Sequence, residues 1–148
     1  MESKTLHIDT GVASYTLNDA VTICFNPTDL VFIERLFSTF GDLDAKQNEI
    51  KADVEKLFAE INAGGDKRKL WDYMREKDAE MRTAIDSALG APVCDALFGK
   101  LSMYAIANGL PVWANLLLGI IDEVDTTYVN EQKLTDSRIR KYSSKYHK

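Results

Sequence analysis

The first part of the chain alternates apolar and polar side chains, whereas the rest repeats them at helical spacing. Alternation is clear in residues 5–9, and two β-prone runs follow at 12–17 and 21–25. Turn-forming residues, Thr10-Gly11 and Asn18-Asp19, separate the three runs. This pattern predicts a small antiparallel β-meander of three strands within residues 1–25. A sheet of that size is marginal in water, so we expect it to lie against helices or another molecule.

A helix start follows the predicted strands. Asn26-Pro27-Thr28-Asp29 combines a capping residue, a proline with a preset φ and an early carboxylate. We expect this helix to be interrupted at Gly41 and a second, amphipathic helix to follow it. The apolar seam of the second helix consists of Leu43, Ile50, Val54, Leu57 and Ile61. Such a seam predicts pairing with another helix, either of the same chain or of a second copy.

Glycines mark the expected ends of the later helices. Ala63-Gly64-Gly65-Asp66 predicts a flexible loop, after which a helix covers residues 67–89. Gly90-Ala91-Pro92-Val93 and Gly109-Leu110-Pro111-Val112 both have the pattern of a helix end followed at once by a helix start. We therefore expect a short helix at 92–98, an apolar turn or helix at 101–107 and a long helix from 111 to about 133. The prediction is one α+β domain over residues 1–148, in which the β-meander precedes a mainly helical body of about five helices at 26–131.

Length and composition narrow the classes of protein. At 148 residues, the chain is long enough to bury roughly two thirds of its unfolded surface. Cys24 and Cys94 lie far apart without a CxxC spacing, which favours two buried thiols in a reducing compartment. The start has no charged-then-apolar leader, and the longest apolar run, residues 116–121, is too short to span a membrane. We expect a cytoplasmic location and no membrane partner.

Charge is distributed unevenly. The formal net charge is −5, but residues 132–148 carry +5 and the preceding residues −10. This basic C-terminal arm, which includes Arg138, Arg140, Lys141 and Lys145, is either a binding element for an acidic surface or a solvated helix end. Because the acidic body would repel phosphate, we expect a protein partner and no nucleic acid.

Residue types that carry catalysis are sparse. His7 and His147 stand at no ligand spacing from a cysteine or from each other, and no phosphate-binding glycine loop occurs. Asp78, Asp86, Asp122 and Asp125 could gather around a divalent cation, but pairing with Arg75, Lys77 and Arg82 explains the same carboxylates. We therefore expect no enzymatic activity, no metal and no cofactor.

Two tryptophans are the large anchors of the chain. Each would be a strong contact for a partner at an exposed position, so both are candidate protein-binding residues. Trp113 stands in the most apolar segment, which favours a place in the core. Trp71 lies between Lys69 and Asp72 beside the predicted loop, where a core position and a contact for a partner are about equally compatible with the pattern.

Three motifs together resemble a family of uncharacterised small proteins of phages and prophages of Gram-positive gut bacteria. They are Val-Thr-Ile-Cys-Phe-Asn-Pro-Thr-Asp, Gly-Ala-Pro-Val-Cys-Asp-Ala-Leu-Phe-Gly and Gly-Leu-Pro-Val-Trp-Ala-Asn-Leu-Leu-Leu-Gly-Ile-Ile-Asp-Glu. The layout of strands before helices is similar to that of siphophage tail assembly chaperones. The resemblance implies a protein that binds the tape measure or another tail protein in the cytoplasm of the bacterial host. Separately, the seam and the apolar segments after Pro92 and Pro111 predict self-association, because they offer more apolar surface than one small sheet can cover.

A second class of function fits the same residues. A phage-encoded binding protein that inhibits a host defence or regulatory protein would have the same composition and the same lack of catalytic motifs. Gene order separates the two, because a chaperone is expected between the tail tube and tape measure genes, whereas an inhibitor is expected outside the structural module.

Overall fold

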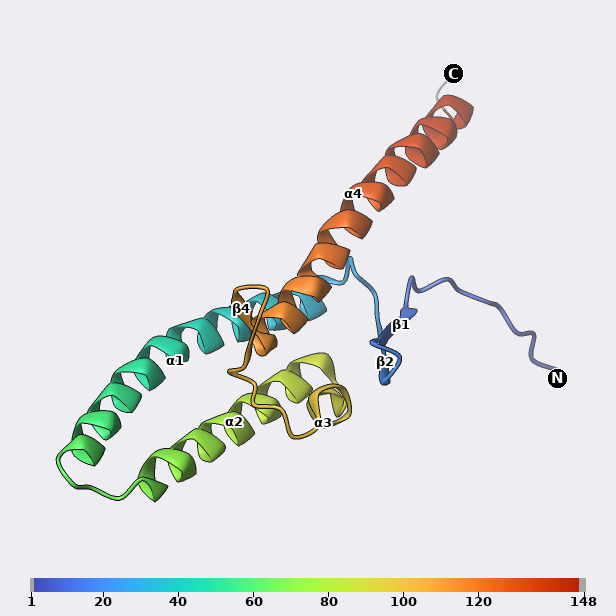
Figure 1. Ribbon diagram of the computed structural model, residues 1–148. Helices are drawn as coiled ribbons and strands as arrows, with labels where there is room; N and C mark the ends of the chain where they lie inside the picture. The colour runs from blue at the N-terminus through green and yellow to red at the C-terminus, as the bar shows by residue number, and fades with distance from the viewer. Residues whose placement is uncertain (1, 147–148) are drawn as a thin grey trace.

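The computed structural model describes the backbone of residues 2–146 and the side chains of residues 2–135 and 141. Its elements, drawn in Figure 1, follow one another in the order β1 (Ala13–Leu17), β2 (Val21–Phe25), α1 (Leu30–Asn62), α2 (Arg68–Leu89), α3 (Val93–Phe98), β3 (Ile106–Ala107), β4 (Leu110–Pro111) and α4 (Val112–Tyr146). The chain is thus α+β, with a small antiparallel hairpin ahead of a mainly helical region, as expected. Four helices are present in the described part, in place of about five.

The N-terminal sheet is a two-stranded hairpin. β1 and β2 pair antiparallel, with Ala13 opposite Phe25 and Leu17 opposite Val21. The predicted three-stranded meander is wrong, because residues 5–9 join no strand. The amide of Asn26 donates to the Thr10 carbonyl at 2.8 Å, and a Cβ on Gly11 would lie 2.6 Å from that same nitrogen. These contacts hold residues 10–11 beside the end of β2, so the chain before them leaves the body instead of turning back along β1 (Figure 1).

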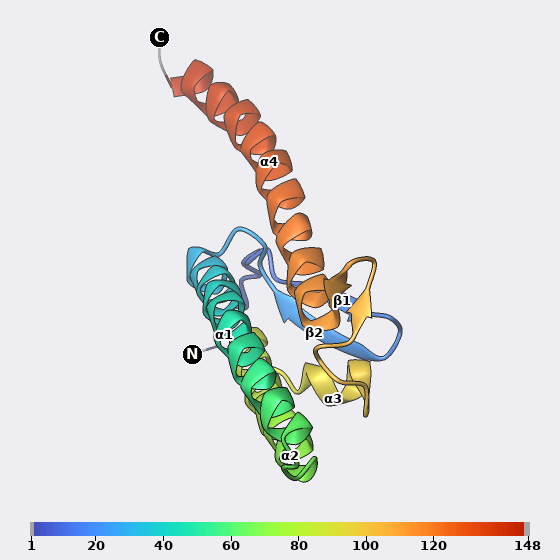
Figure 2. The same cartoon turned by 60° about the vertical axis from the view of Figure 1, so that its left-hand side comes forward.

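α1 and α2 form a long antiparallel helical hairpin, seen from two sides in Figures 1 and 2. The side chain of Asp29 caps α1 by accepting from the Val31 amide at 3.0 Å. The predicted interruption at Gly41 is wrong, since α1 continues for 33 residues. Leu36 and Leu43, on either side of Gly41, are both buried in one stripe, and their packing outweighs the ~1 kcal/mol that a glycine costs inside a helix.

The two Gly-x-Pro-Val motifs form different structures. Gly90 has φ 69° and ends α2 in the left-handed conformation, as predicted. Asn108 and Gly109, at φ 54° and 80°, instead form the two-residue turn of the β3–β4 hairpin. Paired positive φ values suit the twist of a tight hairpin. Residues 101–105 therefore form a turn that leads into β3, and α4 begins after Pro111.

α4 has two parts with different surroundings. From Trp113 to Val124 it presents a buried face to the body, whereas every residue from Tyr128 to Thr135 is exposed. The helix was predicted to end near Lys133, but it continues to Tyr146. Both views show its second part projecting away from the rest of the molecule (Figures 1 and 2).

The core lies where the β1–β2 hairpin, α1, α2, α3 and the first part of α4 meet. Tyr15, Phe25 and Phe32 stack in series with ring centroids 4.5 Å apart, which fixes the inner face of the hairpin on α1. Leu36, Ile85 and Leu117 are fully buried and join α1, α2 and α4. Of the two supports that the sequence left open for the small sheet, helices or another molecule, the structure provides helices of the same chain.

Candidate protein-binding surfaces

The predicted seam of α1 packs within its own chain. Leu43 and Ile50 are buried, which removes them from the surface. Val54, Leu57 and Ile61 are half-buried along the pairing of α1 with α2, towards the tip of the helical hairpin. Of the two partners that the seam left open, the structure provides a helix of the same chain. Only the outer three residues retain surface that a second protein could contact.

Trp113 belongs to the core, as expected from the sequence. Its side chain is 1% exposed and lies 5.5 Å from the Phe40 ring, measured between ring centroids. The indole Nε1–H donates to Oε1 of Gln47 at 3.1 Å. Trp113 is therefore a structural anchor between α4 and α1, and it offers no surface for a partner.

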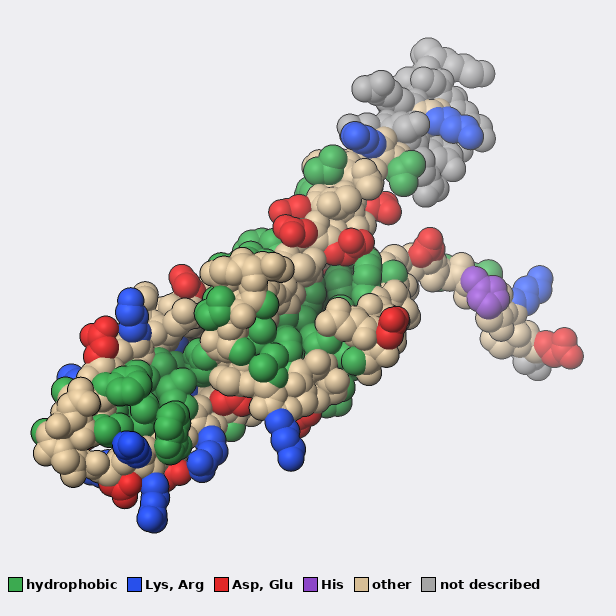
Figure 3. Space-filling view, viewed as in Figure 1, with side chains coloured by type: hydrophobic (Ala, Val, Ile, Leu, Met, Phe, Trp, Pro, Cys, Tyr) green, Lys and Arg blue, Asp and Glu red, His purple; other side chains and the backbone are tan. Residues whose placement is uncertain are grey.

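Trp71 is on the surface, with 54% of its side chain exposed. It borders a shallow pocket of about 440 Å³ with Met74, Arg75, Asp78, Lys100 and Ser102. Phe58 on α1 is also half exposed. Figure 3 shows apolar side chains gathered at this end of the molecule, with charged side chains around them. The tip of the helical hairpin is thus an apolar patch with a charged rim.

The projecting part of α4 carries the predicted basic arm. Tyr128, Val129 and Leu134 are 42%, 50% and 59% exposed, and Lys141 is exposed too. The side chains of Arg138, Arg140 and Lys145 lie outside the described residues. The arm is thus the continuation of a helix that starts in the core.

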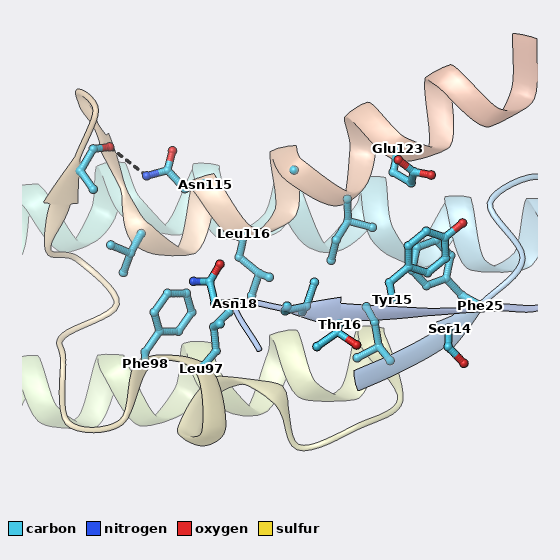
Figure 4. A pocket seen from close by; sticks show the side chains of 16 residues that line it. Ser14, Tyr15, Thr16, Asn18, Phe25, Leu97, Phe98, Asn115, Leu116 and Glu123 are labelled. Atoms are coloured by element: carbon cyan, nitrogen blue, oxygen red, sulfur yellow. Dashed lines mark hydrogen bonds between the residues drawn. The ribbon is translucent and has the colours of Figure 1, made fainter. Parts of the chain in front are cut away.

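An open groove of about 660 Å³ lies between β1 and α4. Figure 4 shows Leu97 and Phe98 of α3 at one end, Tyr15 and Glu123 at the other, and Leu116 of α4 between them. Ser14, Tyr15, Thr16 and Leu17 line one wall, and Gly119 and Ile120 belong to the opposite wall. Burial and the charge of Glu123 raise the pKa of Tyr15, which therefore keeps its hydroxyl proton. The groove is mainly apolar and has polar groups towards its ends.

Two of the carboxylates that suggested a cation site, Asp78 and Asp86, make contacts that connect elements of the fold. Arg82 binds Asp78 at 2.8 Å and Asp95 at 2.9 Å, and it also donates to the Leu101 carbonyl at 2.6 Å. Asp78 accepts in addition from the Met103 amide at 2.7 Å. This network ties α2 to α3 and to the segment before β3. It accounts for Asp78 and Asp95 without a metal ion.

Asp86 caps α3 from a distance. Its Oδ1 accepts from the amides of Val93 and Cys94, each at 2.9 Å. This satisfies two of the unpaired N–H groups that begin a helix.

The two cysteines have different surroundings. Burial and the nearby carboxylate of Asp86 raise the pKa of the Cys94 thiol and keep it protonated. Cys94 is buried as expected, but Cys24 is exposed and lies 3.4 Å from the Ser14 hydroxyl, measured from Sγ to Oγ, so the prediction of burial is wrong for Cys24.

No protein-family model, no curated protein and no solved structure matches this chain. Among the described residues, no group of three or more His, Cys, Asp or Glu side chains is placed to hold a metal ion. Within the same part of the chain, no helix is long and apolar enough to cross a membrane.

Sequence reasoning identified the hairpin tip and the arm but missed the groove. Its walls come from β1, α3 and α4, which lie far apart along the chain, so no local pattern reveals it. One signal was present in the sequence. Gly119 interrupts the apolar run of α4, and no atom lies within 4 Å of the position its Cβ would take. Gly119 lies on the wall of the groove.

Proposed function

We propose that the protein is a non-catalytic assembly factor that binds a helix-rich protein through the projecting part of α4, residues 128–146. The supporting observation is the exposure of every residue from Tyr128 to Thr135. An isolated helix of this length is marginal in water, because most helices in proteins are stabilised by packing. A partner helix that packs along α4 supplies the missing contacts.

The chemistry of the segment indicates what it binds. Tyr128, Val129 and Leu134 offer apolar surface, and the sequence from Gln132 onwards carries +5. A client with apolar and acidic stretches complements both properties. Trp71 and the half-buried side chains beside it, Val54, Leu57 and Ile61, form a second apolar patch that a long client also contacts.

The particular role we propose is that of a tail assembly chaperone for a phage tape measure protein in the bacterial cytoplasm. The sequence resemblance supports this role, and the projecting helix is compatible with it. A tape measure protein is long, helical and prone to aggregate, so an assembly factor that covers its apolar surface keeps it soluble. Inhibition of a host protein is the competing role and requires a different client for the same helix.

Co-expression with a tape measure fragment tests the proposal. We expect the wild-type protein to keep the fragment soluble and to co-purify with it. Leu134→Glu introduces a charge where the exposed apolar side chain stands, and we expect it to weaken binding by about tenfold or more. Gln132→Glu is the matched control, because it adds the same charge to the same exposed turn without removing an apolar group.

Two outcomes would reject parts of the proposal. Equal loss of binding in both variants would show that charge, and not the apolar contact, determines affinity. If the tape measure fragment does not bind while a host protein does bind α4, the client class is wrong and the inhibitor role stands.

A further inference from the structure

We infer that the protein forms a dimer in which residues 5–9 of each copy add as a strand to the free edge of β1 in the other copy. The acceptor is the groove between β1 and α4, and the donor is the segment that leaves the body before Thr10. This inference does not depend on the proposed function, because it concerns contacts between two copies and no client.

The edge of β1 is open along the groove. Among the described strands, β1 pairs only with β2. Five consecutive residues, 14–18, line the groove. Successive side chains of a strand point to opposite faces of the sheet, so a space over one face borders only every second residue. A space that borders consecutive residues therefore runs along the edge of the strand. Alternate N–H and C=O groups of β1 therefore point into the groove, where an added strand can pair with them.

The opposite wall is suited to a closely approaching backbone. Gly119 lies on this wall of α4, with open space where its Cβ would be. Glycine destabilises a helix interior relative to alanine, and no neighbour within the chain requires it here. Leu97, Phe98 and Leu116 supply apolar surface around the same space (Figure 4). The groove therefore fits a strand that pairs with β1 and buries apolar side chains against α3 and α4.

The chain itself carries a strand of the required kind. Leu6 and Ile8 are 80% and 77% exposed, the highest values among the large apolar side chains that the structure describes. They stand two residues apart, so in an extended strand they share one face. Thr5, His7 and Asp9 form the other, polar face. β1 has five residues, so the donor and acceptor strands match in length at roughly 17 Å.

The same contacts that prevent the intramolecular meander favour exchange between copies. Asn26 holds the Thr10 carbonyl at 2.8 Å, and its side chain contacts Gly11 closely. The segment before Thr10 is thereby directed away from its own β1, as Figure 1 shows. In a twofold-symmetric pair, each copy donates one strand and accepts one, which closes the assembly at two chains.

Light scattering combined with size exclusion tests the dimer at tens of micromolar protein. We expect the wild-type protein to have twice the mass of one chain. Leu6→Asp with Ile8→Asp alters the apolar face of the donor, and we expect the mass of a single chain that keeps its helical circular dichroism spectrum, because both side chains are exposed within one chain. The melting temperature is expected to fall only by the stabilisation that dimer formation provides. Thr5→Asp with His7→Asp is the matched control. It places the same two charges on the polar face and is expected to remain dimeric.

A groove variant identifies the acceptor. Gly119→Phe places a ring in the open space beside α4 and is expected to give single chains, whereas Gly119→Ala is expected to remain dimeric. Mixing Leu6→Asp/Ile8→Asp chains with Gly119→Phe chains is the decisive experiment. The first retains an intact groove and the second an intact strand, so one of the two exchanges is restored and a mixed dimer forms.

Hydrogen exchange gives an independent readout. We expect slow amide exchange in residues 5–9 and at the edge of β1 in the wild-type protein, and fast exchange in both single-chain variants. A wild-type protein with the mass of one chain overturns the inference. Dimers that survive Leu6→Asp/Ile8→Asp also overturn it, because they must form through another surface such as α4.

Discussion

Trp113 and Gln47 join the first turn of α4 to the middle of α1 through a hydrogen bond of 3.1 Å from the indole Nε1–H to Oε1. The indole is almost completely buried, so its N–H has no access to bulk water. Replacing Gln47 by Leu removes the acceptor and leaves that donor unsatisfied, and we expect a loss of about 1–3 kcal/mol in the free energy of unfolding. Urea denaturation at a fixed protein concentration measures it. An unchanged midpoint would mean that the bond contributes nothing net.

The two tryptophans are expected to respond oppositely to truncation. Trp113→Ala removes a buried aromatic side chain from the core and is expected to cost about 3–5 kcal/mol. Trp71→Ala, at a position that is 54% exposed, is expected to change stability by no more than about 0.5 kcal/mol. Thermal unfolding of both variants provides the comparison. Similar losses in the two would contradict the placement of Trp71 on the surface.

Arg82 and Arg75 make a matched pair of ionic contacts in the same helix. The Arg82 and Asp78 side chains are 13% and 21% exposed, whereas Arg75 and Asp72 are 76% and 71% exposed. Arg82→Met removes the cation that pairs with Asp78 Oδ2 and the donor to the Leu101 carbonyl, and we expect a loss of about 2–4 kcal/mol. Arg75→Met is expected to cost less than about 0.5 kcal/mol. The argument for the network would fail if the two substitutions were equivalent in chemical denaturation.

Tyr73 is expected to make the free energy of unfolding depend on pH in the alkaline range. Its hydroxyl donates to Oδ2 of Asp53 at 2.6 Å, and burial together with this carboxylate raises the pKa of Tyr73 above the ordinary value of 10.0. The folded state therefore retains a proton that the unfolded chain releases near pH 10. The stabilisation of the folded state that results from this difference in pKa is complete below pH 10, and it is lost as the pH rises through the raised pKa of Tyr73. We expect the stability difference between wild type and Tyr73→Phe to shrink above pH 10, and a constant difference between pH 8 and pH 11 would refute this.

The basic arm is expected to influence association more than folding. Removing residues 135–148 takes away Arg138, Arg140, Lys141 and Lys145, which follow Val124, the last buried residue among the described side chains of α4. Charges of this kind steer encounter with an acidic client, an effect that salt screens over about 8 Å at physiological ionic strength. We expect truncation to slow capture of a tape measure fragment more than it speeds release. Stopped-flow binding at low and high salt measures both rates, and an unchanged on-rate with the same salt dependence would leave the arm without a steering role.

The sequence predicted elements whose signals are local. Asp29 caps α1, Gly90 ends α2 in the left-handed conformation, and the glycines of residues 63–66 separate the two long helices. The seven-residue spacing of the seam predicted a helix with one buried face. These features follow from backbone geometry and periodicity within a few residues, so they need no knowledge of the neighbours.

The errors occurred where a distant contact competed with a local signal. Glycine has a low helix propensity, which predicted a break at Gly41, but the packing of Leu36 and Leu43 stabilises α1 on both sides of it and the helix continues. Residues 5–9 have the alternation of a strand, but Asn26 directs the chain away from β1. Gly109 was correctly expected to adopt positive φ, yet it forms a hairpin turn because β3 and β4 pair on either side of it.

By itself, the sequence determined the α+β class, the start of α1, the end of α2 and the contrast between an acidic body and a basic arm, because propensity, capping and charge are properties of nearby residues. Only the tertiary structure decided which tryptophan is buried, which partner the seam takes and where a groove opens. Those outcomes depend on surfaces brought together from β1, α1, α3 and α4, and burial is a property of such an arrangement, not of a residue type. Trp71 and Trp113 have the same side chain, and only the helices packed around them make one a surface residue and the other the centre of the core.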